Sequence, residues 1–337
     1  MKKNKPIIIW LLSGCFLIFI MVVIGGITRL TDSGLSMVNW NLFMGTIPPL
    51  NKLEWETTFN LYKQYPEYKK INFNITLEEF KSIFFWEYLH RMIGRLLGLV
   101  FIIPFIFFLI KKKLNKKLII QSMILFFLGA LQAFIGWWMV KSGLVNKPDV
   151  SHYRLSIHLI TAFLTCGYTF WIALTLIFPE KKKGNKKLFQ LLLLFFIILI
   201  IQIIYGGFVA GLNAGMGFNT WPKMGDKWIP ESVYSLQPFW KNFVEAKYGV
   251  QFIHRSLGFL IVAIILLILI IKKNYVLTNK EKNALNITTV ITLTQVFLGI
   301  FTLILFVPIV LASIHQITAF LLLMSTIYCL FLFKKSY

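Results

Sequence analysis

Charged residues are scarce in this sequence, and acidic residues are the scarcest. Only 14% of its 337 residues are charged, and 13 Asp and Glu stand against 35 Lys and Arg, a formal net charge of +22. A typical soluble protein is about 25% charged, so this composition argues against a soluble domain. The lysines form short clusters beside apolar segments, which argues against nucleic acid and makes anionic membrane lipids the expected partners.

Cysteines are also few, and none lies where an outer disulfide could form. Cys15, Cys166 and Cys329 all fall inside apolar runs, so each is interpreted as a small core residue. The run that contains Cys15 continues to Ile24, which favours an uncleaved first helix over a lipoprotein signal. No Arg-rich and Ser-rich transit peptide begins the sequence, and a bacterial inner membrane is the expected location.

Long apolar runs dominate the rest of the chain. The hydrophobic fraction is 57% and the mean hydropathy is +0.72. A helix of about 20 apolar residues crosses a bilayer, and eight runs are long enough, at 7–28, 84–110, 118–140, 155–178, 188–210, 250–271, 285–306 and 309–333. The sequence therefore predicts an all-α polytopic membrane protein with eight transmembrane helices.

The lysine clusters predict how these helices are oriented. On the predicted spans all the clusters fall on one side of the membrane, at Lys2 to Lys5, Lys111 to Lys117, Lys181 to Lys187, Lys272 to Lys282, and Lys334 with Lys335. Positive residues mark cytoplasmic loops. Both termini are therefore expected in the cytoplasm.

The two halves of the chain carry the same motifs in the same order. The matching elements are Gly25-Gly26 with Gly206-Gly207, His90-Arg91 with His254-Arg255, Gln132 with Gln295, and Ser156-Ile157-His158 with Ser313-Ile314-His315. Each half has four spans, an even number, so the repeat is parallel. We expect two four-helix bundles, an N-terminal one over 1–180 and a C-terminal one over 181–337.

Four histidines at matched positions are the main candidates for a functional site. His90, His158, His254 and His315 each lie near the start of an apolar run, and the topology places all four on the outer side. Two imidazoles facing each other within a bundle could hold a haem iron. A histidine that only makes hydrogen bonds is the alternative; zinc or copper fits less well, because no carboxylate or thiolate completes a cage.

The residues beside the histidines differ in charge between the halves. Arg91 and Arg255 each follow a histidine on the outer side, where a guanidinium could bind haem propionates, cap loop carbonyls or reach lipid headgroups. Glu87 lies three residues before His90, whereas the equivalent residue before His254 is Gln251. We expect a reactive N-terminal site, in which Glu87 moves protons or orients water, and an electron relay in the C-terminal one. The alternative is that Glu87 only pairs with Arg91.

Together these motifs resemble the haem A synthase family over the whole chain. The resemblance rests on Gly25 to Ser36, on Glu87-x-x-His90-Arg91 and on the later histidine contexts. Pro48-Pro49-Leu50-Asn51, and the absence of an outer cysteine pair, are similar to the branch of mitochondria and related bacteria, so a mechanism based on a thiol pair is not expected.

The resemblance implies an activity and roles for the site residues. Such enzymes oxidise the C8 methyl group of haem O to a formyl group, giving haem A for terminal oxidases, with a haem b as cofactor. It implies that His254 and His315 are the axial ligands of haem b, and that His90, His158 and Glu87 face the substrate haem. A haem O synthase in the same membrane is an expected partner, and no motif identifies the electron donor.

Two other functions are compatible with paired histidines. A dihaem b-type membrane cytochrome would transfer electrons from quinol, but it gives the Glu87/Gln251 difference no purpose. A haem or lipid transporter would be expected to carry polar groups or broken helices at the membrane midplane. These midplanes are almost uniformly apolar, so a transporter ranks third.

Overall fold

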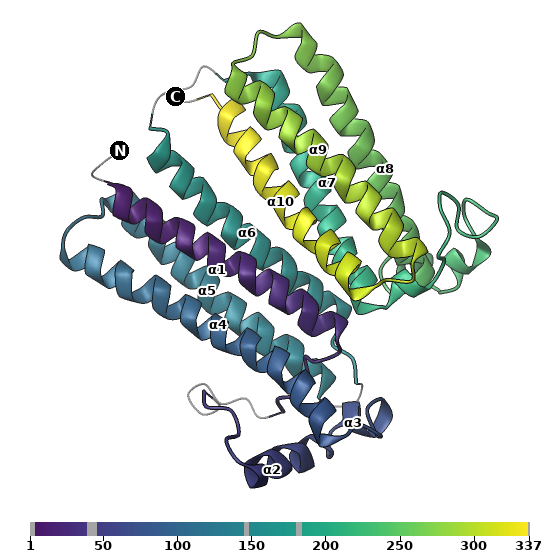
Figure 1. Cartoon of the computed structure of the whole chain (residues 1–337). Helices are drawn as coiled ribbons and strands as arrows, with labels where there is room; N and C mark the ends of the chain where they lie inside the picture. The colour runs from purple at the N-terminus through teal and green to yellow at the C-terminus, as the bar shows by residue number, and fades with distance from the viewer. Residues whose placement is uncertain (1–3, 39–45, 145–147, 180–183, 336–337) are drawn as a thin grey trace. The chain divides into compact units, whose positions relative to one another are not determined.

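A computed structural model describes residues 4–38, 46–144, 148–179 and 184–335. Within these ranges the chain is helical, apart from an isolated bridge between Met224 and Lys227. Eight helices are long and apolar enough to cross a membrane, which confirms the predicted fold class. They are α1 (Lys5–Leu30), α4 (Leu77–Ile110), α5 (Lys116–Gly143), α6 (His152–Ile177), α7 (Lys186–Gly211), α8 (Lys247–Ile271), α9 (Asn279–Ile304) and α10 (Ile309–Phe333) (Figure 1).

Several of these helices begin at a polar cap. Asn115 and Asn185 accept hydrogen bonds from the backbone three residues ahead and so start α5 and α7. Thr76 forms a capping box with Glu79 at the start of α4, satisfying amides that have no partner within the helix. Helix α4 therefore begins seven residues before the predicted apolar run, because the cap and not hydropathy sets its start.

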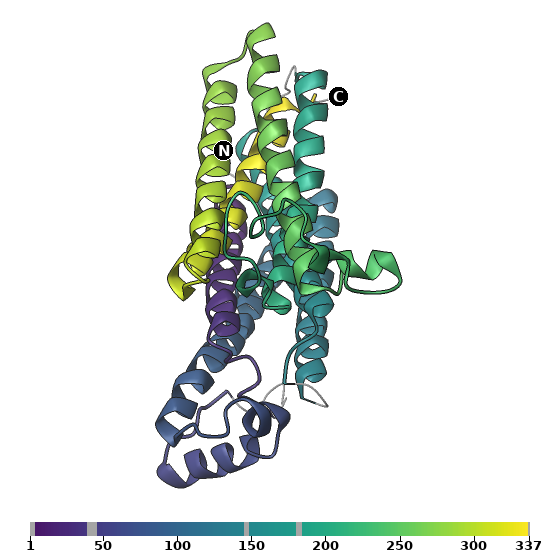
Figure 2. The same ribbon diagram turned by 90° about the vertical axis from the view of Figure 1, so that its right-hand side faces the viewer.

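The chain divides into two compact units. Residues 13–165 form one, here the N-terminal unit, and residues 1–12 with 166–337 form the other, the C-terminal unit. In the C-terminal unit α7 packs against α8, α9 against α10, and α10 against α7 (Figure 2). The predicted boundary at 180/181 lies outside the described residues, as do Lys2, Lys3 and Lys181 to Lys183. The assignment of one haem site to each half stays a prediction.

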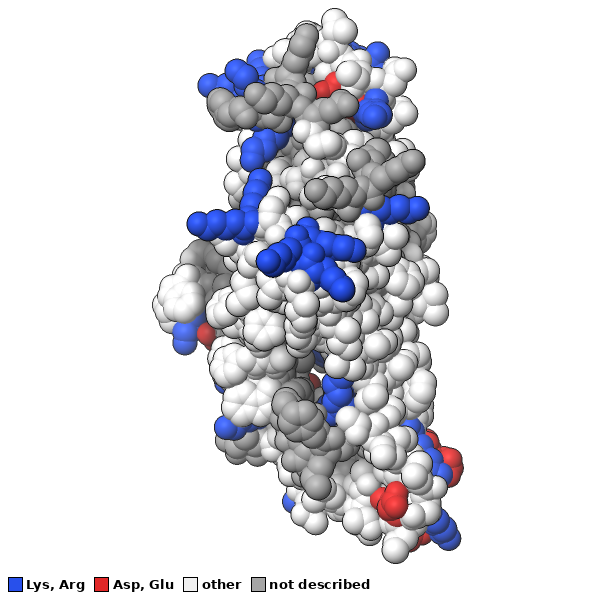
Figure 3. Space-filling view, turned by 90° about the vertical axis from the view of Figure 1, so that its left-hand side faces the viewer, with Lys and Arg blue, Asp and Glu red and all other residues white. Residues whose placement is uncertain are grey.

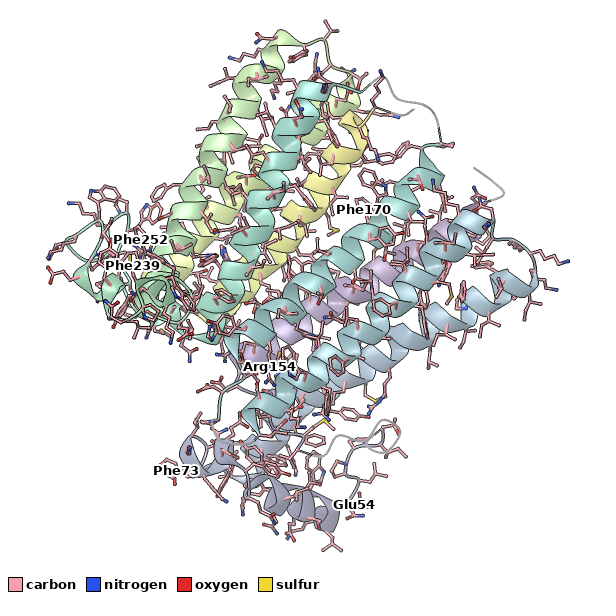
Figure 4. The ribbon with its side chains drawn as sticks, turned by 180° about the vertical axis from the view of Figure 1, so that it is seen from behind. Glu54, Phe73, Arg154, Phe170, Phe239 and Phe252 are labelled. Carbon is pink, nitrogen blue, oxygen red and sulfur yellow. The ribbon has the colours of Figure 1, made fainter. Side chains whose placement is uncertain are left out.

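Each unit carries a folded segment beyond its apolar helices. In the N-terminal unit, α2 (Lys52–Tyr62) and α3 (Pro66–Lys70) pack near the start of α4. In the C-terminal unit, residues 212–246 include η2 (Ala214–Met216), η3 (Glu231–Tyr234) and η4 (Phe239–Phe243). Figure 4 shows Glu54 and Phe73 on the first segment and Phe239 on the second, beside Phe252 of α8. Both segments follow the helices that end with the paired glycines.

Charge is unevenly distributed along the N-terminal unit. In Figure 3, lysines of the α4–α5 connection stand near the middle of the view, and a broad band without charged side chains lies below them. Mixed acidic and basic groups reappear at the lower end, around α2 and the first turns of α4. Such a band is expected of a surface that faces lipid.

Candidate haem sites

Each histidine of the N-terminal pair, His90 and His158, faces a glycine on a neighbouring helix. His90 projects from α4 toward Gly25 of α1, where an added Cβ would stand 3.0 Å from its Cε1. His158 projects from α6 toward Gly136 of α5, with the corresponding distance at 3.1 Å. Each imidazole therefore occupies space that a side chain would fill if the facing glycine were any other residue.

The C-terminal histidine pair, His254 and His315, repeats this arrangement. His254 of α8 faces Gly206 of α7, and His315 of α10 faces Gly299 of α9, with distances from an added Cβ to Cε1 of 3.5 and 2.9 Å. The repeat seen in the sequence is thus a repeat of side-chain packing, in which each histidine has its own glycine.

Glutamines contact three of the four rings. Gln202 Nε2 lies 3.4 Å from His254 Nε2, and Gln295 Nε2 lies 3.3 Å from His315 Nε2. Gln132 Nε2 donates to the carbonyl of His158 at 2.8 Å and lies 3.1 Å from its Nδ1. In each contact the glutamine amide nitrogen is the donor, and the contact helps to hold the imidazole ring in its orientation.

Three rings nevertheless keep a buried nitrogen without a partner. Among the described residues, the Nδ1 atoms of His90, His254 and His315 are buried and accept or donate no hydrogen bond. An unsatisfied buried nitrogen is costly and calls for a missing partner. A haem iron bound by imidazole supplies one, and Gly98 of α4, with no described atom within 4 Å of an added Cβ, leaves space beside the helix. The residues present therefore fit a haem.

Glu87 and Arg91 hold the loop that follows α1. Glu87 is 3% exposed, and its Oε2 accepts hydrogen bonds from the Ser36 hydroxyl at 2.7 Å and the Met37 amide at 2.8 Å. Arg91 donates to Glu87 Oε1 at 2.5 Å and to the Met37 carbonyl at 2.8 Å. We call this arrangement of Glu87 and Arg91 around Met37 the N-terminal clamp.

The C-terminal unit has the same clamp with one charge fewer. Gln251, also 3% exposed, accepts from the Phe218 amide at 3.3 Å and donates to the Phe218 carbonyl at 3.1 Å. Arg255 donates to that same carbonyl at 2.9 Å. Gln251 and Arg255 around Phe218 form the C-terminal clamp. Glu87 and Gln251 thus occupy equivalent places, and the predicted i,i+4 pairing of Glu87 with Arg91 is present.

Arg91 and Arg255 take the loop-capping role that the sequence left open beside propionate binding. Besides Arg91 and Arg255, Arg154 of α6 donates to the Trp138 carbonyl at 2.6 Å and lies over the Trp138 ring (Figure 4). Arg29 pairs with Asp32 at 2.8 Å. Binding of haem propionates by Arg91 and Arg255 stays a prediction.

A cavity of about 220 Å³ lies beside the N-terminal clamp. It is lined by Met37, Val38, Arg91, Trp137, Val140, Lys141 and Leu144. Lys141 is exposed and stands over the Trp137 ring, at 5.1 Å from its centroid. A cavity with apolar walls and two cations suits a ligand that carries both an apolar body and a carboxylate.

Comparison with known proteins identifies the family of this chain. A family model described as cytochrome oxidase assembly protein, COX15-CtaA, matches residues 8–327. The heme A synthase of Flavobacterium psychrophilum is 52% identical over 339 residues, covering 99% of this chain and 100% of that protein. The chain belongs to the haem A synthase family. The heme A synthases of Flavobacterium johnsoniae and Wolbachia pipientis are 51% and 41% identical, and each match covers 99% of this chain and 99% or 94% of the relative.

For this member of the haem A synthase family, sequence reasoning found the histidines but missed their surroundings. The glycines at 25, 136, 206 and 299 belong to the repeated motifs, but the sequence does not show that each of them faces a histidine on a neighbouring helix. Gln202 went unnoticed because its counterpart in the first half is Met21. Ser36 was noted only as the end of the Gly25 to Ser36 motif, since nothing in the sequence shows that it reaches Glu87.

Proposed function

We propose that this chain, as a haem A synthase, converts haem O to haem A by oxidising the C8 methyl group to a formyl group. In this proposal the N-terminal histidine pair faces the substrate haem, and the C-terminal pair holds haem b. The observation that carries the proposal is the repeated setting of paired histidines and glycines, with a buried, unpartnered nitrogen on both histidines of the C-terminal pair. Family membership supports the activity.

His254 and His315 would hold the cofactor in the C-terminal unit. A haem b with two imidazole ligands supplies electron transfer and has no open site for oxygen. Gly206 and Gly299 leave the space in which the two rings stand, and Gln202 and Gln295 fix the ring planes through Nε2. Arg255 supplies the positive charge at the outer end of this site.

The N-terminal unit would bind haem O between α4 and α6. His90 and His158 orient the porphyrin, and Arg91 and the cavity beside it receive its carboxylate edge. The methyl group is oxidised in two two-electron steps, through an alcohol, by an oxidant that this chain does not itself supply, and each C–H bond that breaks leaves a proton to be accepted. The Glu87 carboxylate, the acid of the N-terminal clamp, is the group proposed to take these protons.

The cellular setting belongs to the same proposal. The chain is a multi-pass membrane protein with eight candidate spans. We place it in the bacterial inner membrane with both termini in the cytoplasm. Within the family, we assign it to the branch without the outer cysteine pair. A haem O synthase in the same membrane would deliver the apolar substrate directly. The electron donor is a separate component.

The test is mass spectrometry of haems extracted from membranes that contain this chain and a source of haem O. Haem A is expected with the intact chain and not with His254→Ala, because that variant loses an axial ligand of haem b. His152→Ala is the matched control, since His152 belongs to neither pair, and it should keep activity. Unchanged haem O beside a bound b-type haem in the intact protein would contradict the proposal and favour a dihaem cytochrome.

A further inference from the structure

The two clamps differ by one charge in otherwise equivalent geometry. In the N-terminal clamp the Glu87–Arg91 ion pair has side chains only 4% and 10% exposed. In the C-terminal clamp Gln251 holds the loop through neutral hydrogen bonds. The Glu87–Arg91 pair is thus largely removed from water, whereas Arg255 is partly exposed, so its charge is offset by no carboxylate and only in part by solvent screening.

The positive charge of Arg255 is therefore not neutralised by its protein neighbours. Its guanidinium donates to three carbonyls, those of Phe218, Thr220 and Lys223, at 2.9, 2.7 and 3.1 Å. Its Nε is buried without a hydrogen-bond partner, and within residues 184–335 no carboxylate pairs with it. Carbonyl dipoles orient the guanidinium but leave its unit charge, which favours an anion nearby.

We propose that the residue three positions before the first histidine of each half sets how tightly that half retains a haem. Gln251 leaves Arg255 free to attract a carboxylate of the porphyrin, so the cofactor stays bound. Glu87 already neutralises Arg91, so the substrate haem is held more weakly and its product can leave. This inference rests on the proposed function, because it assumes a resident haem in one half and a haem that turns over in the other.

The cavity beside the N-terminal clamp is where a porphyrin carboxylate would compete with the Glu87 carboxylate for Arg91. Arg91 lines the cavity while bonded to Glu87, so a porphyrin carboxylate that enters there meets a guanidinium already paired with an acid. Lys141 also lines the cavity, but it is exposed and its charge is screened by solvent. The buried pair therefore dominates the difference between the two sites.

The repeat supplies matched variants that separate charge from fold. Glu87→Gln places in the N-terminal clamp the same amide side chain that Gln251 has in the C-terminal clamp. Gln251 accepts from the backbone amide of its loop and donates to the carbonyl of the same residue, so Gln at this position can still hold the loop. The reverse change, Gln251→Glu, recreates the carboxylate of the N-terminal clamp. Glu54→Gln, on the exposed surface of α2, removes a charge from the same unit as Glu87 and is the control.

The experiment measures haem release from the purified, detergent-solubilised proteins to an excess of apomyoglobin, followed optically, with the haems identified by chromatography. Glu87→Gln is expected to release haem O and haem A at least about tenfold more slowly than the intact chain. Gln251→Glu is expected to release haem b at least about tenfold faster. Glu54→Gln should match the intact chain.

Equal release rates in the intact chain and in Glu87→Gln would overturn the inference. If Gln251→Glu loses haem because it unfolds, which a loss of helical circular dichroism would show, the release rates of Glu87→Gln decide the inference. Failure of the proposed function has a different signature, because the intact chain would then make no haem A from haem O. Release rates of added haem O are measured independently of conversion, so the two outcomes are distinct.

Discussion

At the scale of residues, the sites are built from contacts between histidine and glycine on neighbouring helices. His315 and Gly299 make the tightest of these contacts, with 2.9 Å from an added Cβ to Cε1. Close packing leaves no slack for an extra carbon, so the ring would have to turn away. The orientation of each imidazole therefore depends on a glycine, which has no side chain, on the neighbouring helix.

We predict that Gly299→Ala weakens binding of haem b. An extra carbon in a packed interior costs about 1–3 kcal/mol, which corresponds to about a five- to 150-fold loss of affinity. The measurement is the haem b content of the purified protein, by optical absorption. Gly129→Ala is the control, since no described atom lies within 4 Å of its added Cβ. Full haem content in Gly299→Ala would show that the glycine does not position His315.

At the scale of elements, α2 and α3 form a small core with the first turns of α4. Tyr62 and Phe80 are fully buried there, beside Phe59 and Phe84. Glu67 is 4% exposed and accepts a hydrogen bond from the Tyr62 hydroxyl at 2.9 Å. Desolvation by burial raises the pKa of Glu67 to about 8. This carboxyl is therefore neutral in the folded segment at pH 7.

The segment should accordingly lose stability as the pH rises. Below about pH 4.5, Glu67 is protonated in the folded and the unfolded chain and has no effect. Between there and about pH 8 only the unfolded chain releases the proton, so the free energy of unfolding falls. Hydrogen exchange of residues 52–75, corrected for intrinsic rates, should show weaker protection at pH 8.5 than at pH 6.

Glu67→Gln is the matched variant for this prediction. Its amide oxygen can still accept from Tyr62, but it carries no proton that titrates. Protection of residues 52–75 should then depend little on pH. A pH dependence equal to that of the intact chain would assign the effect to another group.

At the scale of the whole molecule, the lysine clusters and the alternation of eight spans predict one orientation. Lysines flank the connection between the end of α8 and the start of α9. The 212–246 segment joins the end of α7 to the start of α8, and so lies at the opposite end of α8. Cytoplasmic loops carry the excess of positive charge. Residues 212–246 are therefore expected outside, together with the clamps and both histidine pairs.

Labelling of single cysteines in intact cells tests this orientation. In a chain whose native cysteines are replaced, Asp226→Cys should react with a membrane-impermeant maleimide and Lys282→Cys should not. Both positions are exposed, so access alone does not separate them. Reaction of Lys282→Cys after the cells are opened is the control. Labelling of Lys282→Cys in intact cells would place the termini outside.

The sequence alone determined the membrane class, the eight helices and the family resemblance, and the structure and the comparisons confirm all three. Apolar run length and the internal repeat are local properties that can be read without knowing any contact. The start of α4 was not readable from hydropathy, because a cap at Thr76 sets it. The predicted roles of His90, His158, His254, His315 and Glu87 remain predictions.

Only the tertiary structure decided what surrounds those residues. Met37 and Glu87 are 50 residues apart in the chain yet share a hydrogen bond of 2.8 Å. Gly299 and His315 meet because α9 and α10 pack together, and no sequence spacing states which face each helix presents. Side-chain partners across helices depend on packing angles and rotamers, which are properties of the folded chain. The equivalence of Glu87 and Gln251 as loop clamps therefore became visible only in three dimensions.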